Sequence, residues 1–304
     1  MLHLLLAFAL QKPEPLDVVV TIPDLADLVR IIGGDAVRVE VMVPPGADPH
    51  AILPKASLLL KLQRADALVC MGLDFEHAFL PALLEKVNND RIQPGQPGWC
   101  CAADRIIPLE VPASLDRSQG ADLHPRGNPH FNLDPENGRL MAQGVRDLLV
   151  RLDPARAAAY EAQWQAWDAD AQRRIARWTA RMAPLRGRAI ATYHRSWSYF
   201  AARFGLELAG EVEPKPGLPP DAAHLVGLRR SLREKQVKVL LIEPWYSERS
   251  LRHLLEGTGT VVARSGTCCG EGQTYLDFME AIVDAVANAH GIPEQGGGEE
   301  AAAD

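Results

Sequence analysis

The chain has 304 residues, of which 47% are hydrophobic and 23% are charged, and its net charge is −7. This length and apolar content are enough for two lobes with cores of their own. A mildly acidic chain lacks the excess of positive charge that binds a polyanion, so we expect no nucleic-acid partner.

The first ten residues, MLHLLLAFAL, resemble the apolar centre of an export signal. The basic stretch that normally precedes such a centre is missing, and no A-x-A cleavage site follows. The run is too short to span a membrane. We interpret residues 1–12 as a shortened signal segment, which predicts an exported, soluble, periplasmic protein. A buried first strand is the alternative.

Strand-like and helical runs then alternate. Residues 18–21 are mostly β-branched, residues 25–32 place leucine, valine and isoleucine on one side of a helix, and residues 37–43 alternate as a strand does. Residues 55–65 look helical, and residues 67–71 form a buried-strand run. This rhythm predicts a largely parallel sheet with helices on both faces.

Residues 92–129 are rich in proline, glycine and polar residues, and we expect loops there around one short strand at 106–109. A helix should follow from Pro135 to about residue 152, because Asp134 suits an N-cap and proline suits the first helical position.

Asp153 and Pro154 predict a second helix with the same cap chemistry, running to about residue 182. Its apolar stripe has spacings of three and four residues: Tyr160, Trp164, Trp167, Ala171, Ile175, Trp178 and Met182. Such a helix would be about 40 Å long and could run along two lobes and tie them together. An ordinary long helix on the surface of one domain is the alternative.

The rhythm restarts after Pro184, with strands expected at 188–193, 237–242 and 260–263 and a last helix at 274–290. The tail at 291–304 has the composition of a disordered segment. The predicted fold class is therefore α/β, with two parallel-sheet lobes at 16–152 and 184–290, joined by one long linker helix at 153–183.

Three histidines share one type of context. His50 and His194 each follow a predicted strand, and His130 stands in the proline-stiffened loop GNPHFNLDP. Ligands of open α/β sheets bind beyond the carboxyl ends of strands. Three imidazoles there suit a borderline cation such as Zn²⁺, and Glu243, which also follows a strand, could complete a tetrahedral site. Asp48 more simply braces the loop of His50 or hydrogen-bonds to an imidazole.

The remaining histidines lack such a context. His124 precedes His130 in the same loop and is at most a loose accessory ligand. We interpret the others as surface or helix residues: His3, His77, His224, His253 and His290.

Five cysteines include two adjacent pairs, Cys100 with Cys101 and Cys268 with Cys269, besides Cys70. In an exported protein these pairs suggest one disulfide between them, with at least one thiol left over. Buried free thiols are the alternative.

Four stretches resemble the metal-binding solute receptors of ABC transporters, the cluster A-I family that includes zinc-uptake and manganese-uptake receptors. They are MVPPGADPHAILPKASLLLKLQRADALVCMGLDFE, NPHFNLDP, YHRSWSYFAARFGLE and VKVLLIEPWYSERSLRHLLEGTG, in the order of the family. The resemblance implies two α/β lobes, one long rigid helix and a metal site in the cleft between the lobes. It also implies that His50, His130 and His194 are metal ligands, with a histidine at the third place as in the zinc receptors.

The sequence departs from the family at the fourth ligand. Many members take an aspartate from the loop after the last strand, which here reads ARSGTCCGEG. We rank Glu243 first for this place, ahead of water, Cys268 or Cys269, and Glu271. The segment before His130 is also short and holds few histidines, so a metal-collecting role for it is doubtful.

The resemblance implies a receptor that carries Zn²⁺ as transported ligand, partnered by a cognate membrane permease and expected to be a monomer. A manganese or iron receptor of the same family is the first alternative. A zinc hydrolase would use the same three imidazoles with water, but no H-E-x-x-H motif supports it. An adhesin with the same fold is the third alternative.

Overall fold

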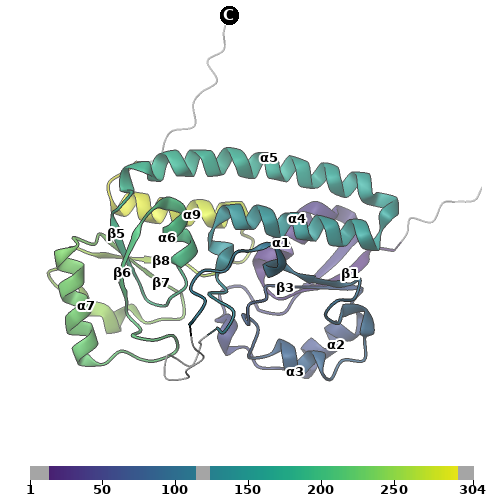
Figure 1. The fold of residues 1–304 in the computed structure, drawn as a ribbon, viewed down its shortest axis with the longest axis horizontal. Coiled ribbons are helices and arrows are strands. Elements are labelled where there is room, and N and C mark those ends of the chain that lie inside the picture. Colours follow the sequence, from purple (N-terminus) through teal and green to yellow (C-terminus); the bar gives the residue numbers. More distant parts are fainter. Residues whose placement is uncertain (1–13, 114–123, 294–304) are drawn as a thin grey trace, which may run out of the picture.

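The computed structural model describes residues 14–113 and 124–293. The predicted signal segment at 1–12 lies outside these ranges, as does the expected tail apart from residues 291–293. Each half of the described chain contains a four-stranded parallel sheet, and a long helix runs along both (Figure 1). The predicted fold class is confirmed.

The two sheets have the same topology. The first has the order β2-β1-β3-β4, and its strands are Leu16–Val20 (β1), Val37–Val41 (β2), Ala67–Cys70 (β3) and Trp99–Cys101 (β4). The second has the order β6-β5-β7-β8, from Ala189–Thr192 (β5), Glu207–Glu211 (β6), Val239–Ile242 (β7) and Val261–Arg264 (β8). Because every pairing is parallel, the carboxyl ends of the strands in each sheet meet at one edge.

Helices cover both faces of the first sheet: α2 and α3 lie on the side opposite to α4 and α5 (Figure 1). The helices of the first half are Pro23–Gly33 (α1), Ala56–Arg64 (α2), Leu80–Leu84 (α3) and Pro135–Leu152 (α4). Those that follow are Ala157–Met182 (α5), Ser198–Phe204 (α6), Ala222–Glu234 (α7), Arg252–Leu255 (α8) and Tyr275–Ala289 (α9). No helix within the described ranges is both long and apolar enough to cross a membrane.

Two local predictions were wrong. Residues 106–109 form no strand, because the amide of Leu109 donates to the Tyr199 hydroxyl and its carbonyl accepts from Asn128. The fourth strand is β4 instead. The long helical run starts at Pro154 as expected, with a 3₁₀ turn at Pro154–Arg156 before α5. The predicted cap is absent, because the Asp153 carboxylate accepts from Arg156 and Tyr160 instead.

The predicted disulfide between the cysteine pairs is also not formed, and all five cysteines are free thiols. Cys100 and Cys101 lie on β4, at the edge of the first sheet, where Cys101 is the register partner of Cys70. Cys269 lies in the loop after β8, and its amide donates to the carboxylate of Asp24 on α1. The two pairs therefore belong to different parts of the fold.

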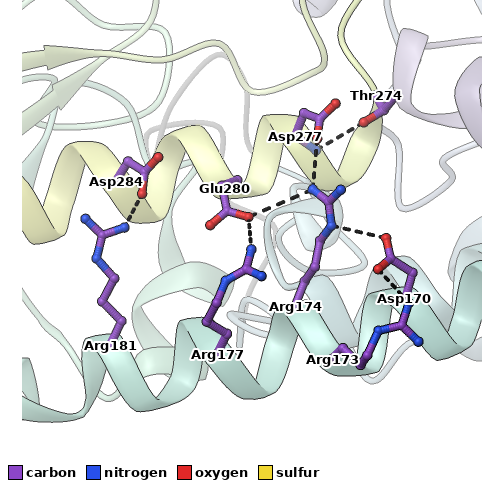
Figure 2. A network of polar contacts seen from close by, with 9 residues as sticks. All are labelled: Asp170, Arg173, Arg174, Arg177, Arg181, Thr274, Asp277, Glu280 and Asp284. Atoms are coloured by element: carbon purple, nitrogen blue, oxygen red, sulfur yellow. Dashed lines mark hydrogen bonds and ion pairs between the residues drawn. The ribbon is translucent and has the colours of Figure 1, made fainter. Parts of the chain in front are cut away.

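The stripe on α5 is buried as predicted, and ion pairs join the C-terminal part of this helix to α9. Every residue of the stripe is buried except Trp164, which is partly buried beneath the guanidinium of Arg146. Figure 2 shows a ladder of ion pairs between α5 and α9, namely Arg174–Asp277, Arg177–Glu280 and Arg181–Asp284. The arginines and acids advance together along two neighbouring helices, so the ladder fixes the register of α9 on α5.

The two halves share a large hydrophobic core, beside which a smaller cluster lies in the second half alone. Helix α9 follows the second sheet in sequence, yet it contacts α1, α4 and α5. Its buried side chains, such as Phe278 and Ile282, belong to the same cluster as Leu25 and Leu28 of α1. A buried polar link adds to this contact, because Asn132 donates both to Asp24 and to the carbonyl of Thr267. The domain boundaries stay a prediction, and the lobes are joined by more than the long helix.

Candidate metal centre

The structure brings the three predicted histidines together. His50 lies in the 3₁₀ turn Pro49–Ala51, where its amide donates to Asp48, so Asp48 braces this loop as expected. His130 immediately precedes the turn Phe131–Leu133, and His194 lies two residues beyond β5. Each side chain offers one nitrogen, and these three nitrogens lie within 4.8 Å of one another.

The spacing of two of these nitrogens fits one metal ion. Nε2 of His50 and Nε2 of His130 are 3.3 Å apart. Two nitrogens bound to one tetrahedral zinc at its usual bond length lie about 3.3–3.4 Å apart. The pair therefore has the spacing of one edge of a coordination tetrahedron, and His194 offers a third corner.

Hydrogen bonds determine which ring nitrogen of His130 and of His194 is available to bind a metal ion. Nδ1 of His194 lies 2.7 Å from a carboxylate oxygen of Glu213, and Nδ1 of His130 lies 3.0 Å from the amide oxygen of Asn128. Both acceptors are oxygens, so each Nδ1 carries the proton and each Nε2 carries the lone pair. This is the arrangement in which carboxylates and amides orient metal-bound imidazoles.

Glu213 and Asn128 are functional candidates that our sequence analysis missed. Glu213 follows β6, a strand that the sequence analysis did not anticipate, so the strand-end rule that selected His194 and Glu243 was not applied to it. Asn128 belongs to the quoted loop GNPHFNLDP, and it also accepts from the backbone amide of His130.

Electrostatics favour neutral imidazoles at the centre. Burial lowers the pKa of His50 and of His130 well below the ordinary histidine value, and neighbouring imidazoles lower both further. Neutral imidazole is the form that binds metal, so these two need not lose a proton at neutral pH before binding.

Comparison with known proteins shows the family of the chain. Residues 18–289 match the family model described as "ZnuA: Zinc-uptake complex component A periplasmic". The chain belongs to this family. It is therefore a metal-binding solute receptor of the kind that serves ABC transporters.

Relatives of the receptor are named for more than one metal. It is 26% identical to "Iron-binding protein YfeA" of Yersinia pestis, over 90% of this chain and 86% of that protein. It is 24% identical to "High-affinity zinc uptake system protein ZnuA" of Yersinia pestis, over 91% of this chain and 94% of that one. A crystal structure of a zinc-bound ZnuA deletion mutant is 29% identical, with a TM-score of 0.77, covering 91% of this chain and 98% of that chain.

Glu243, the predicted fourth ligand, lies in the interior of the receptor directly after β7. It is fully buried, and its Oε1 accepts from the Ser196 hydroxyl and the Trp197 indole at 3.0 and 3.2 Å. Its Oε2 is buried without a hydrogen-bond partner among the described residues. Burial raises the pKa of Glu243 to about 7, and His194 opposes this rise. The cluster of three nitrogens does not include Glu243, so its ligand role stays a prediction.

The other candidates for the fourth place lie in the loop after β8. Burial raises the pKa of the Cys268 and Cys269 thiols well above the ordinary value, so neither is a thiolate before metal binds. Glu271 is exposed. None of the three belongs to the group of side chains that could hold a metal ion among the described residues.

A cavity of about 250 Å³ opens onto the centre. His130 and His194 line it together with His124, Arg195 and Lys215. Its residues come from both halves of the chain, so the centre lies between the two lobes. The cavity gives a metal ion, or a water bound to it, a way to reach the imidazoles.

Two further histidines lie beside the centre. The ring of His124 is 5.2 Å from the ring of His50, and the ring of His77 is 5.7 Å from it. Our interpretation of His77 as a plain surface residue is incomplete, because the turn after β3 carries this exposed side chain to the mouth of the centre. A single histidine on an irregular turn has no periodic signal that would reveal this in the sequence.

Proposed function

We propose that this receptor captures Zn²⁺ at His50, His130 and His194, here called the inner site, and delivers it to a cognate membrane permease. The observation that carries the proposal is the convergence of three imidazole nitrogens within 4.8 Å. The tautomers of His130 and His194 support it, because each presents Nε2 to the centre. A site made of nitrogens favours zinc over manganese, which prefers oxygen ligands.

We further propose that the fourth place is taken by Glu243 through Oε2, or by a water in the cavity. The orphaned and buried Oε2 supports the first option, since a buried carboxylate oxygen without a partner is costly. The role is binding rather than catalysis, and we expect a periplasmic monomer. No covalent step is needed for a cation to be held and released.

A receptor for iron or manganese is the second candidate, and the iron-binding relative favours it. The zinc-bound structural neighbour favours the first candidate. The fold accommodates either cargo, so the ligand set decides between them. If Glu243 joins the three imidazoles, the site gains one oxygen ligand and its preference for zinc should weaken.

The test is a zinc titration of the metal-stripped protein in the presence of excess manganese. We expect one tightly held zinc that manganese does not displace. His194→Ala should weaken it strongly, whereas His253→Gln, which removes an exposed histidine of α8, should leave it unchanged. Glu243→Gln separates the two options for the fourth place. A wild-type protein that prefers manganese or iron, or binds zinc equally well without His194, would contradict the proposal.

A further inference from the structure

Asn128, which orients His130, uses every hydrogen-bonding group of its side chain. Its Oδ1 accepts from the backbone amide and from Nδ1 of His130, both at 3.0 Å. Its Nδ2 donates to Oε2 of Glu110 at 2.9 Å and to the carbonyl oxygen of Arg195 at 2.8 Å. A flipped amide would turn Nδ2 toward the backbone N–H of His130 and Oδ1 toward two acceptors. These partners therefore fix the amide in the orientation that His130 needs.

Glu110 reaches Asn128 from a loop that lies directly against it. The backbone amide of Asn128 donates to the carbonyl oxygen of Leu109 at 2.8 Å. Gly127 allows this approach, because a Cβ atom there would lie 2.8 Å from the same oxygen. Glu110 itself has a φ angle of 53°, a left-handed backbone that is unfavourable for glutamate. Such conformations persist where the surroundings enforce them, and they are common at functional sites.

The second half of the chain contacts the same loop. Oε1 of Glu110 accepts from the hydroxyl of Ser198, on α6, at 2.9 Å. The Tyr199 hydroxyl accepts from the amide of Leu109 at 2.9 Å and donates to the carbonyl of Asn128 at 2.8 Å. Glu110 is an exposed residue, yet both of its carboxylate oxygens make hydrogen bonds to protein groups. Its carboxylate is therefore held in one place rather than left to move in solvent.

A continuous chain of hydrogen bonds leads from this carboxylate to the inner site. It runs from Oε2 of Glu110 through the amide of Asn128 to Nδ1 of His130. Hydrogen bonds in such a chain strengthen one another, because each polarises the next. A negative charge at the far end makes Oδ1 of Asn128 a better acceptor, and the imidazole then becomes a better electron-pair donor through Nε2. His194 receives the same kind of support directly, from the carboxylate of Glu213.

We propose that Glu110 is a positioning residue for metal binding, which acts through Asn128 to orient His130 and to strengthen it as a ligand. The effect on metal affinity rests on the proposed function, because it is seen only if His130 is a ligand. The effect on the His130 imidazole does not, since the chain of hydrogen bonds needs no metal.

The test substitutes glutamine for Glu110, which removes the charge and keeps the shape. The glutamine oxygen can still accept from Asn128, and the Ser198 hydroxyl can rotate to accept from the new amide. Zinc affinity should fall about threefold to tenfold, at or below the low end of the range for groups that bond directly to a metal-bound imidazole. Ser198→Ala is the matched control. It removes one contact of the same carboxylate but leaves its charge and its bond to Asn128, so the loss should be below about twofold.

A second readout follows the imidazole itself, by nuclear magnetic resonance of metal-stripped protein with isotope-labelled histidine. The Nδ1–H signal of His130 is identified by its absence from His130→Gln. In Glu110→Gln this proton signal should move to higher field, as a weaker hydrogen bond requires, and in Ser198→Ala it should stay in place. In a His130→Ala background, Glu110→Gln should cost no further zinc affinity.

The two readouts separate this proposal from the proposed function. A wild-type chain that binds no zinc would contradict the proposed function, and the His130 signal would still decide on Glu110. A signal that does not move in Glu110→Gln would overturn the positioning role. So would an equal loss of affinity in Ser198→Ala, because that result is expected of a residue that only joins the two halves of the chain.

Discussion

Replacing Glu213 by glutamine tests how the protein prepares His194 for metal. The carboxylate accepts from Nδ1 of His194 at 2.7 Å, and both side chains are less than 10% exposed. The second oxygen of Glu213 accepts from the Tyr246 hydroxyl at 3.0 Å. Glutamine keeps an oxygen for His194, and the Tyr246 hydroxyl can rotate to accept from the new amide. The substitution therefore removes the negative charge while the shape and the hydrogen bond to His194 are kept.

The expected loss is about 10- to 100-fold in zinc affinity, because a carboxylate partner raises the basicity of a metal-bound imidazole and fixes its tautomer. This corresponds to about 1.4–2.8 kcal/mol of binding free energy. The assay is a competition titration of metal-stripped protein against a chelator of known affinity at pH 7. Tyr246→Phe is the matched control. It keeps the ring stacked on Tyr193 and the carboxylate in place, so its loss should be below about threefold.

A double-mutant cycle decides whether the effect passes through His194. With His194→Ala as the background, Glu213→Gln should cost little further affinity, since the imidazole that it orients is gone. Equal losses in the two backgrounds would refute the reasoning, as would a Glu213→Gln protein that binds zinc like wild type.

Three more predictions follow from buried groups. Burial raises the pKa of Asp24 from 3.8 to about 6, so the folded state holds its proton to higher pH than the unfolded state. The free energy of unfolding should therefore fall by up to about 3 kcal/mol as the pH rises from about 4 to about 6, and urea melts of Asp24→Asn should lack this component. Asp284→Ala should lower the free energy of unfolding by about 3 kcal/mol in the same assay, because Arg181 is 4% exposed and would be left as an unpaired buried charge. As the control, Arg177→Ala removes a more exposed ion pair and should lower it by less than about 1 kcal/mol. Thiol titration in denaturant without reductant should count five thiols, and a count of three would show that one disulfide is present.

Much of the fold was predictable because the spacing of apolar residues marks most of its helices and strands. The helix from Pro135 to Leu152 was predicted to the residue, since its N-cap and N1 proline mark the start. Strand β6 was not anticipated, and β4 was placed several residues too late. Neither strand has a fully buried residue, so their sequences lack the apolar run that marks β3 and β7.

Two of the candidate metal ligands, His50 and His194, were predictable because they follow predicted strands, and His130 was selected from its proline-stiffened loop. The three histidines converge in the structure. The residues that orient them are harder to find, because Asn128 acts from a loop, and the choice of Glu213 over neighbouring acids depends on three-dimensional distance. The position of His77 beside His50 depends on the turn that follows β3, in which Leu73 and Asp74 both have positive φ angles. A positive φ angle at a residue other than glycine is uncommon and is seldom predictable from the sequence.

The packing of α9 into the shared core sets the order in which the chain can fold. The first lobe is encoded almost entirely before residue 152, yet its α1 packs against a helix that ends at residue 289. At ordinary rates of synthesis the ribosome needs on the order of ten seconds to pass from α4 to α9. During that interval the apolar face of α1 that α9 will cover has no partner. The first lobe therefore cannot complete its core until α9 has joined it.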